Sequence, residues 1–119
     1  MNGLRFDVQQ RMKIELPDDY WDYLESDGAI AEGFADGFPG YFVLWHPDEI
    51  EKNNADMSVQ SLAPGFLGFG GNGSGEILAF NHTGAVYSLP MIGMEARYAE
   101  KVANSWTEFR GRIKSDKST

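Results

Sequence analysis

Residues 65–81 read GFLGFGGNGSGEILAFN and place Gly68, Gly70 and Gly73 at the spacing G-x-G-x-x-G. This spacing is typical of dinucleotide-binding loops, which need a helix beginning inside the motif, and of kinase glycine loops, which need a lysine strand and an Asp-Phe-Gly metal site. Here a strand pattern, SGEILAF, follows the glycines, and the kinase motifs do not occur in the chain. Since no helix N-terminus would meet the phosphates, we expect these glycines to turn a β-hairpin and to bind no nucleotide or other cofactor.

The segments on either side of the hairpin predict further short strands. AIAEGF at 29–34 and YFVLW at 41–45 are separated by the Gly/Pro-rich turn ADGFPG, and AVYSLP at 85–90 follows the turn NHTG. Together with the two strands of the hairpin, these segments predict a mostly antiparallel sheet of about five short strands.

Helices are expected to flank this sheet. Apolar residues at four-residue steps over 4–12 favour a short N-terminal helix. Pro17, with two aspartates behind it, suits the first turn of a second helix, and Gly28 suits its C-terminal cap. HPDEIEKNNADM at 46–57 places a proline and acidic residues at the start of a third, short helix.

The end of the chain carries the longest apolar stripe. Tyr98, Val102, Trp106, Phe109 and Ile113 follow steps of four, four, three and four residues, which predicts a long C-terminal helix with Trp106 buried. Helices segregated from an antiparallel meander indicate an α+β fold. We expect one domain over residues 1–119, with residues 115–119 as a frayed tail.

Composition narrows the class of protein. The 119-residue chain is 42% hydrophobic and has no cysteine, so thiolate nucleophiles, disulfides and Cys-based zinc sites are excluded. Its net charge of −8 disfavours nucleic acid as a partner. The longest apolar run, YFVLW, is too short to cross a bilayer, and MNGLRFDVQQR lacks the apolar core of a secretory signal. We therefore expect a cytoplasmic protein without a membrane partner.

The acidic residues are concentrated in the first half of the chain. Residues 1–56 hold 13 acidic and 4 basic side chains, whereas residues 57–119 hold 5 and 6. A solvated face explains such a run in general, and a surface that steers a basic partner explains it more specifically. Under the second interpretation, the candidate partner-binding residues are carboxylates in or beside loops and short elements: Glu32, Asp36, Asp48 and Glu51.

No catalytic or metal-binding constellation emerges from the residue pattern. His46 stands at a predicted helix entrance and His82 in a turn, and neither has a second histidine at metal-ligand spacing. Ser74 lies in NGSGE, which is not the G-x-S-x-G elbow. We therefore predict a protein that is not an enzyme, although paired carboxylates keep a small hydrolase as the third hypothesis.

Several segments together resemble a known family. They are IELPDDYWDYLESDGAI at 14–30, YFVLWHPDEIEKNN at 41–54, PGFLGFGGNGSGEILAFNHTGAVYSLP at 64–90 and YAEKVANSWTEFR at 98–110. In order and spacing they resemble the SUKH superfamily, in particular the Smi/Knr cell-wall-assembly-regulator type. The resemblance covers about residues 10–110. The chain departs from the family pattern at QQRMK, in the first predicted helix, and at the Gly/Pro-rich EGFADGFPG.

The resemblance implies an α+β domain without known catalysis. Many bacterial members are immunity proteins that bind and neutralise toxin domains, and eukaryotic relatives are regulatory interaction modules. This chain is accordingly expected to be a non-catalytic immunity protein whose acidic half binds a basic toxin. The alternative is a cytoplasmic regulatory or scaffolding module with a host protein as its partner.

Overall fold

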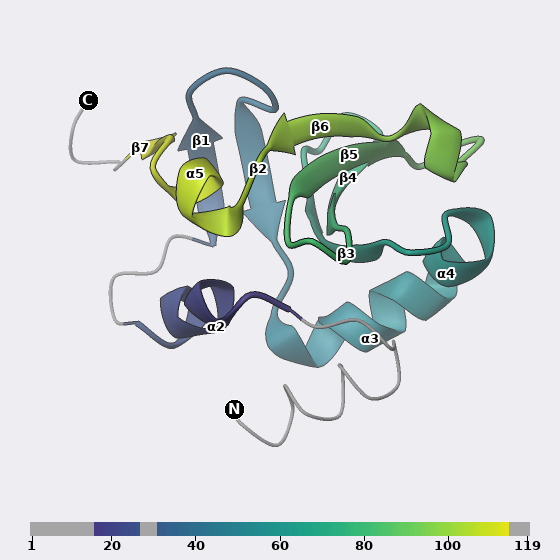
Figure 1. Cartoon of the computed structure of the whole chain (residues 1–119), viewed down its shortest axis with the longest axis horizontal. Helices are drawn as coiled ribbons and strands as arrows, with labels where there is room; N and C mark the ends of the chain where they lie inside the picture. The colour runs from purple at the N-terminus through teal and green to yellow at the C-terminus, as the bar shows by residue number, and fades with distance from the viewer. Residues whose placement is uncertain (1–15, 27–30, 115–119) are drawn as a thin grey trace.

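The computed structural model describes residues 16–26 and 31–114, which build a curled antiparallel sheet with helices packed against it (Figure 1). Within these residues the sheet has seven strands in the order β6-β5-β4-β3-β2-β1-β7. Strands β1 to β6 each pair antiparallel with the next strand in the chain, β2 and β3 across the intervening helices α3 and α4, and β7 returns to pair with β1. The strands are β1 Glu32–Ala35, β2 Tyr41–Leu44, β3 Leu67–Gly71, β4 Glu76–Phe80, β5 Val86–Pro90, β6 Glu100–Ala103 and β7 Ile113–Lys114.

The helices occupy two places around the sheet. In Figure 1, α5 lies beside β1 and β2, α2 lies below α5 and packs against it, and α3 runs below the sheet and leads to α4. The bounds are α2 Asp18–Glu25, α3 Pro47–Asp56, α4 Val59–Leu62 and α5 Trp106–Arg110, with a 3₁₀ turn η1 at Ala96–Tyr98. The predicted helices at Pro17 and at Pro47 are thus confirmed. The predicted N-terminal helix, the Gly28 cap and the 115–119 tail lie outside the described residues.

The glycine-rich stretch forms the β3–β4 hairpin, as its sequence predicts. The side chain of Asn72 holds the turn together, because its Oδ1 accepts hydrogen bonds from the backbone N–H groups of Ser74 and Glu76 at 2.9 and 3.2 Å. Its Nδ2 donates to the Glu76 carboxylate at 2.7 Å. A Cβ at Gly70 would collide with the carbonyl oxygen of Val43 on β2, so this glycine permits close strand packing.

A large aromatic cluster fills the space between one face of the sheet and helices α2 and α5. Tyr20 lies at its centre, with its ring 5.1–5.5 Å from those of Trp21, Phe69, Phe80 and Trp106. Phe69 and Phe80 stack across the β3–β4 pair at 4.1 Å. Trp106 is buried, as its sequence pattern predicts. Aromatic side chains bury more area than any others, so this cluster dominates the stability of the fold.

A smaller cluster covers the opposite face of the sheet. Alternate residues of β4 divide between the two clusters, with Leu78 and Phe80 in the large one and Ile77 and Ala79 in the small one. Val59 of α4 also belongs to the small cluster. The list of its buried members is completed by Ala63, Leu89 and Met94.

Two predictions about the C-terminal part of the chain were wrong. The apolar stripe from Tyr98 to Ile113 is not one long helix, because it is divided among η1, β6, α5 and β7. Two of these, β6 and β7, raise the number of strands from the expected five to seven. Pairing of β6 with β5 supplies hydrogen bonds that compete with a helix, and the Ser105 hydroxyl begins a new helix by accepting from Glu108 N at 3.1 Å.

Arg112 links the two ends of the sheet. Its guanidinium donates a 2.6 Å hydrogen bond to the carbonyl oxygen of Val102 on β6, and its own carbonyl accepts from Asp36 N at the end of β1 at 2.8 Å. Val102 stands at a β-bulge, since Val86 pairs with Ala103 and Tyr87 with Lys101. One residue therefore ties β6, at one border of the curled sheet, to the end of β1 near the other border.

Candidate interaction surface

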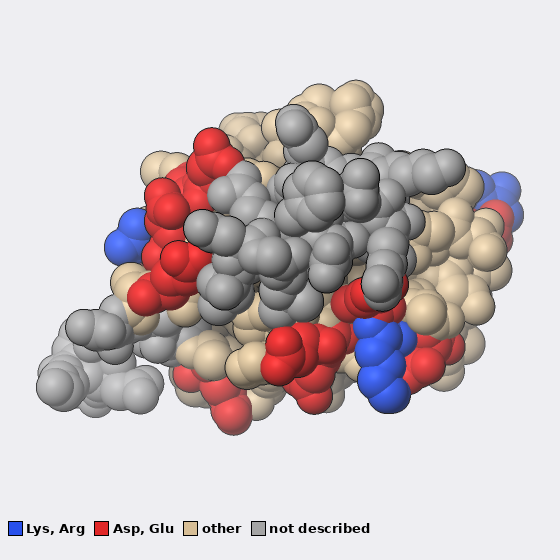
Figure 2. All heavy atoms as spheres, turned by 90° about the horizontal axis from the view of Figure 1, so that it is seen from below, with Lys and Arg blue, Asp and Glu red and all other residues tan. Residues whose placement is uncertain are grey.

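Helices α2 and α3 carry most of the acidic side chains on one side of the molecule. Each helix contains four acidic residues, and Lys52 is the one base in the two helices. In the view from below, the acidic side chains of the described residues stand in groups at the left and along the lower edge, with few described Lys or Arg side chains among them (Figure 2). We call this surface the acidic face and define it by Asp18, Asp19, Asp22, Glu25, Asp48, Glu49, Glu51 and Asp56.

Local structure favours carboxylates at these positions. Both helices begin with a pair of acidic residues, which the positive end of the helix dipole stabilises. His46 caps α3, because its Nδ1 accepts a 3.2 Å hydrogen bond from Asp48 N. Lys52 donates to Asp56 at 2.7 Å, and this hydrogen bond raises the pKa of Lys52. His46 therefore acts as the N-terminal cap of α3.

The four predicted partner-binding residues do not form one cluster. Asp48 and Glu51 are three residues apart on α3 and belong to the acidic face. Glu32 pairs with Val43 at the end of the β1–β2 hairpin that leads to α3, whereas Asp36 stands at the turn end of the hairpin. The structure brings the first two together and places the other two on a separate hairpin.

Both residues on the hairpin have partners. The Tyr41 hydroxyl donates a 2.7 Å hydrogen bond to the Glu32 carboxylate, and this bond raises the pKa of Tyr41. Asp36 forms a 3.0 Å ion pair with Lys114 on β7, in which both side chains are exposed. Exposed pairs of this kind contribute little to stability. Asp36 is thus partly neutralised, whereas the partner of Glu32 within the described residues is the neutral phenol of Tyr41.

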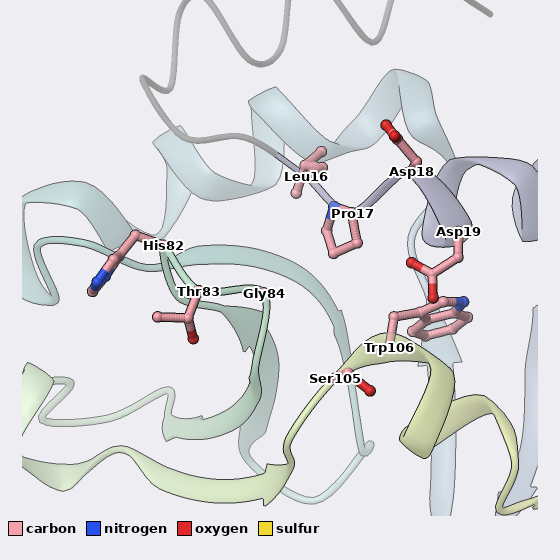
Figure 3. A pocket seen from close by; sticks show the side chains of 9 residues that line it. All are labelled: Leu16, Pro17, Asp18, Asp19, His82, Thr83, Gly84, Ser105 and Trp106. Atoms are coloured by element: carbon pink, nitrogen blue, oxygen red, sulfur yellow. The ribbon is translucent and has the colours of Figure 1, made fainter.

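A pocket of about 370 Å³ opens between the start of α2, the β4–β5 turn and the loop before α5 (Figure 3). Asp18 and Asp19 line it on the α2 side, His82 and Thr83 on the turn side, and Ser105 at the start of α5. Its remaining lining residues are Leu16, Pro17, Gly84 and Trp106.

The residue types in this pocket match a Ser-His-Asp triad, but their hydrogen bonds do not. Ser105 Oγ caps α5, and Asp19 accepts a hydrogen bond from the Thr107 hydroxyl, which joins α2 to α5. The Thr83 hydroxyl donates to Asn81 at 2.7 Å. A triad requires the base within hydrogen-bond reach of the nucleophile, and within the described residues His82 forms no such bond to Ser105. Asp19, Thr83 and Ser105 are therefore already engaged in structural hydrogen bonds, and one of these bonds joins α2 to α5.

Sequence reasoning missed the contribution of α2 to the acidic face. The candidates were chosen in loops and short elements, so Asp18, Asp19, Asp22 and Glu25 were passed over. A usable signal was present, because residues 18–25 hold four acids and no base. The apolar face of the same helix also predicts its orientation, since Tyr20, Trp21 and Tyr23 are buried.

The described part of the chain can also be considered for a metal site and for a membrane-spanning helix. Over residues 16–26 and 31–114, no three His, Asp or Glu side chains converge as a metal ion would need. None of the helices described there combines the length and the apolar character that a membrane span requires.

Comparison with known proteins assigns the family. No curated protein matches the chain. A family model, described as the SMI1 / KNR4 family (SUKH-1), matches residues 6–112. The matched residues include α2, α3, the glycine hairpin and α5. They therefore include the four segments that carry the resemblance in the sequence. The chain therefore belongs to the SMI1/KNR4 family (SUKH-1).

Proposed function

We propose that this protein is a non-catalytic binding module that neutralises a cognate bacterial toxin domain by binding it through the acidic face. The observation that carries the proposal is the concentration of eight carboxylates on α2 and α3 with one base among them. A surface of one sign attracts a partner of the opposite sign and accelerates encounter. The partner is accordingly a protein domain with a basic surface.

Two further observations support a binding role. Membership of the SMI1/KNR4 family is consistent with an immunity-type protein-binding module. In the pocket beside α2, the Ser105 hydroxyl caps α5 and the Thr83 hydroxyl donates to Asn81, so both hydroxyls have structural roles. Neutralisation by steric blockade needs no chemistry from the immunity protein itself.

The test uses a candidate toxin domain encoded beside this gene. Asp48→Lys with Glu51→Lys changes the charge of the acidic face by four units. We expect this double variant to associate on the order of tenfold more slowly at low salt, with the difference shrinking at about 0.5 M NaCl. The association rate is measured by stopped-flow fluorescence over a salt series.

The matched control changes the same charge elsewhere. Glu95→Lys with Glu100→Lys alters two exposed residues outside α2 and α3. This control should retain a rate within about twofold of the wild type. Equal slowing by both pairs would mean that net charge alone acts, and unchanged rates would mean that the acidic face is a solvated surface. Binding to a host protein without protection against the toxin would instead favour the regulatory alternative.

A further inference from the structure

A second surface feature lies on the face of the sheet that carries the small core cluster. An open groove of about 370 Å³ is formed by Val43 of β2, Trp45 directly after it, Met57 at the end of α3, the β3–β4 hairpin and Met91 after β5. Ligand pockets span roughly 300–1,000 Å³, so this groove is large enough for one sizeable side chain. We call it the apolar groove.

Glycines form one wall of the apolar groove, where another chain can approach the backbone closely. Gly71, Gly73 and Gly75 of the hairpin all line it. Gly75 adopts a φ of +98°, and a Cβ added there would meet nothing within 4 Å. Glycines at such positions permit close approach of another chain. The glycine-rich hairpin therefore also exposes its main chain beside the groove.

Exposed apolar side chains continue the surface on both sides. The ring of Tyr41 lies against Gly73, and Phe34, which is 59% exposed, contacts Tyr41 at 5.7 Å between ring centroids. On the other side, Met91 is 45% exposed and leads to Ile92, which is 93% exposed. Extended apolar patches of this kind mark sites of protein association. Methionines at the groove adapt to the shape of the side chain that they receive.

The charges around the groove define the chemistry of the occupant. Among its lining residues, the titratable side chain is Glu76, and no Lys or Arg is present. Glu32 lies on the same outer face, since its carboxylate bonds the Tyr41 hydroxyl. A small-molecule site would need several free polar groups, whereas Glu76 is already bonded to Asn72. The groove and the carboxylates near it are therefore complementary to an apolar side chain that is flanked by basic residues.

We propose that the apolar groove is an anchor site, in which an extended segment of the protein partner inserts one large apolar side chain between basic residues. This inference rests on the proposed function and deepens it: the acidic face attracts the partner, and the groove holds it. Interfaces commonly combine a buried apolar anchor with a charged, solvated rim. The groove therefore governs dissociation, whereas the acidic face governs encounter.

The experiment titrates ¹⁵N-labelled full-length protein with the blocked peptide Gly-Lys-Leu-Lys-Gly and follows amide chemical shifts. We expect saturable shifts at Gly71, Gly73, Gly75 and Ile77, with a Kd on the order of a millimolar for so short a ligand. Replacing the leucine of the peptide by alanine should weaken binding on the order of tenfold. Replacing its two lysines by glutamates should abolish the shifts.

Two variants of the protein sharpen the test. Met91→Arg places a positive charge in the groove and should weaken binding of the lysine peptide at least tenfold. Leu62→Arg adds the same charge at an exposed position on α4, outside the groove and its continuation, and should leave the affinity within about twofold. Both positions are exposed, so both variants are expected to fold.

Each remaining outcome overturns the inference in a distinguishable way. Shifts confined to α2 and α3 would retain the proposed function and remove the groove from it. Equal binding of the lysine and glutamate peptides would refute the basic flanks. Concentration-dependent shifts at the groove without peptide, lost in Met91→Arg, would show that a second copy of this chain is the occupant.

Discussion

At the scale of single residues, the buried polar groups separate into satisfied and unsatisfied ones. Asn54 is fully buried, and its side chain bonds Gly68 N at 2.8 Å, Gly68 O at 2.9 Å and Ile50 O at 2.7 Å. It thereby fastens α3 to β3. Tyr20 is also fully buried, but its hydroxyl has no hydrogen-bond partner in the described residues. Such an unpaired group costs stability that only its aromatic contacts offset.

Tyr20→Phe tests this contrast. Removing an unpaired hydroxyl while keeping the ring should leave the free energy of unfolding unchanged or raise it by about 1 kcal/mol. Chemical denaturation at neutral pH measures the difference. A loss above about 1 kcal/mol would mean that the hydroxyl has a partner.

The same variant gives a pH signature. Burial raises the pKa of Tyr20 above its ordinary value of 10.0, so the folded state holds the phenolic proton more firmly than the unfolded state does. The stability that this provides is complete below pH 10 and is lost as pH rises above it. Tyr20→Phe should lack this alkaline loss, so its advantage over the wild type should grow above pH 10.

At the scale of the elements, sequence reasoning succeeded where the signals were local. Turn glycines, helix-start prolines and apolar runs predicted the β3–β4 hairpin, the start of α3 at Pro47 and the strand at 41–44. The prediction of one long helix after residue 95 failed. Apolar residues three or four positions apart occur in a helix, and they also occur in a series of short elements that all face one core. Pairing of β6 with β5 spans the chain from 86 to 103, and no local pattern reports it.

The candidate sites divide in the same way. The acidic bias of the first half of the chain could be read directly from the sequence, and two of the four chosen carboxylates lie on the acidic face. The apolar groove could not be predicted, because residues 43, 57, 75 and 91 meet only through the sheet. These residues are far apart in the sequence and come together only in the folded chain.

Ser105→Ala tests why α5 begins where it does. The Ser105 hydroxyl accepts from Glu108 N, so its loss leaves one N–H of a short helix without its cap. The expected cost is about 1 kcal/mol of unfolding free energy, within the usual range of 0.5–2 kcal/mol. Ser74→Ala in the glycine turn serves as the control, because the turn uses the backbone N–H of Ser74, and it should change stability by less than about 0.5 kcal/mol. Equal effects at both positions would refute the capping role.

At the scale of the whole molecule, net charge opposes folding. The chain carries −8, and its carboxylates are crowded on one side, so the folded state bears more self-repulsion than the unfolded one. Raising NaCl from about 20 to 500 mM screens this repulsion. We expect the melting temperature to rise by about 2–6 °C, as a gain near 1 kcal/mol would produce.

Differential scanning calorimetry measures this effect. The Asp48→Lys, Glu51→Lys double variant provides an internal comparison, since it removes part of the repulsion and should respond less to salt. A melting temperature that falls with salt, or an identical response in both proteins, would show that repulsion among the carboxylates of the acidic face does not destabilise the folded state.

The link that Arg112 makes between β6 and the β1–β2 turn has a consequence for aggregation of the protein. Sheet borders recruit strands from other chains and so begin fibres. On the β6 border, the guanidinium occupies the Val102 carbonyl, which is an acceptor that an incoming strand would need, and the bulge disturbs the register. On the other border, β7 is two residues long. Both borders of the sheet that the structure describes are therefore poor templates for a strand from another chain.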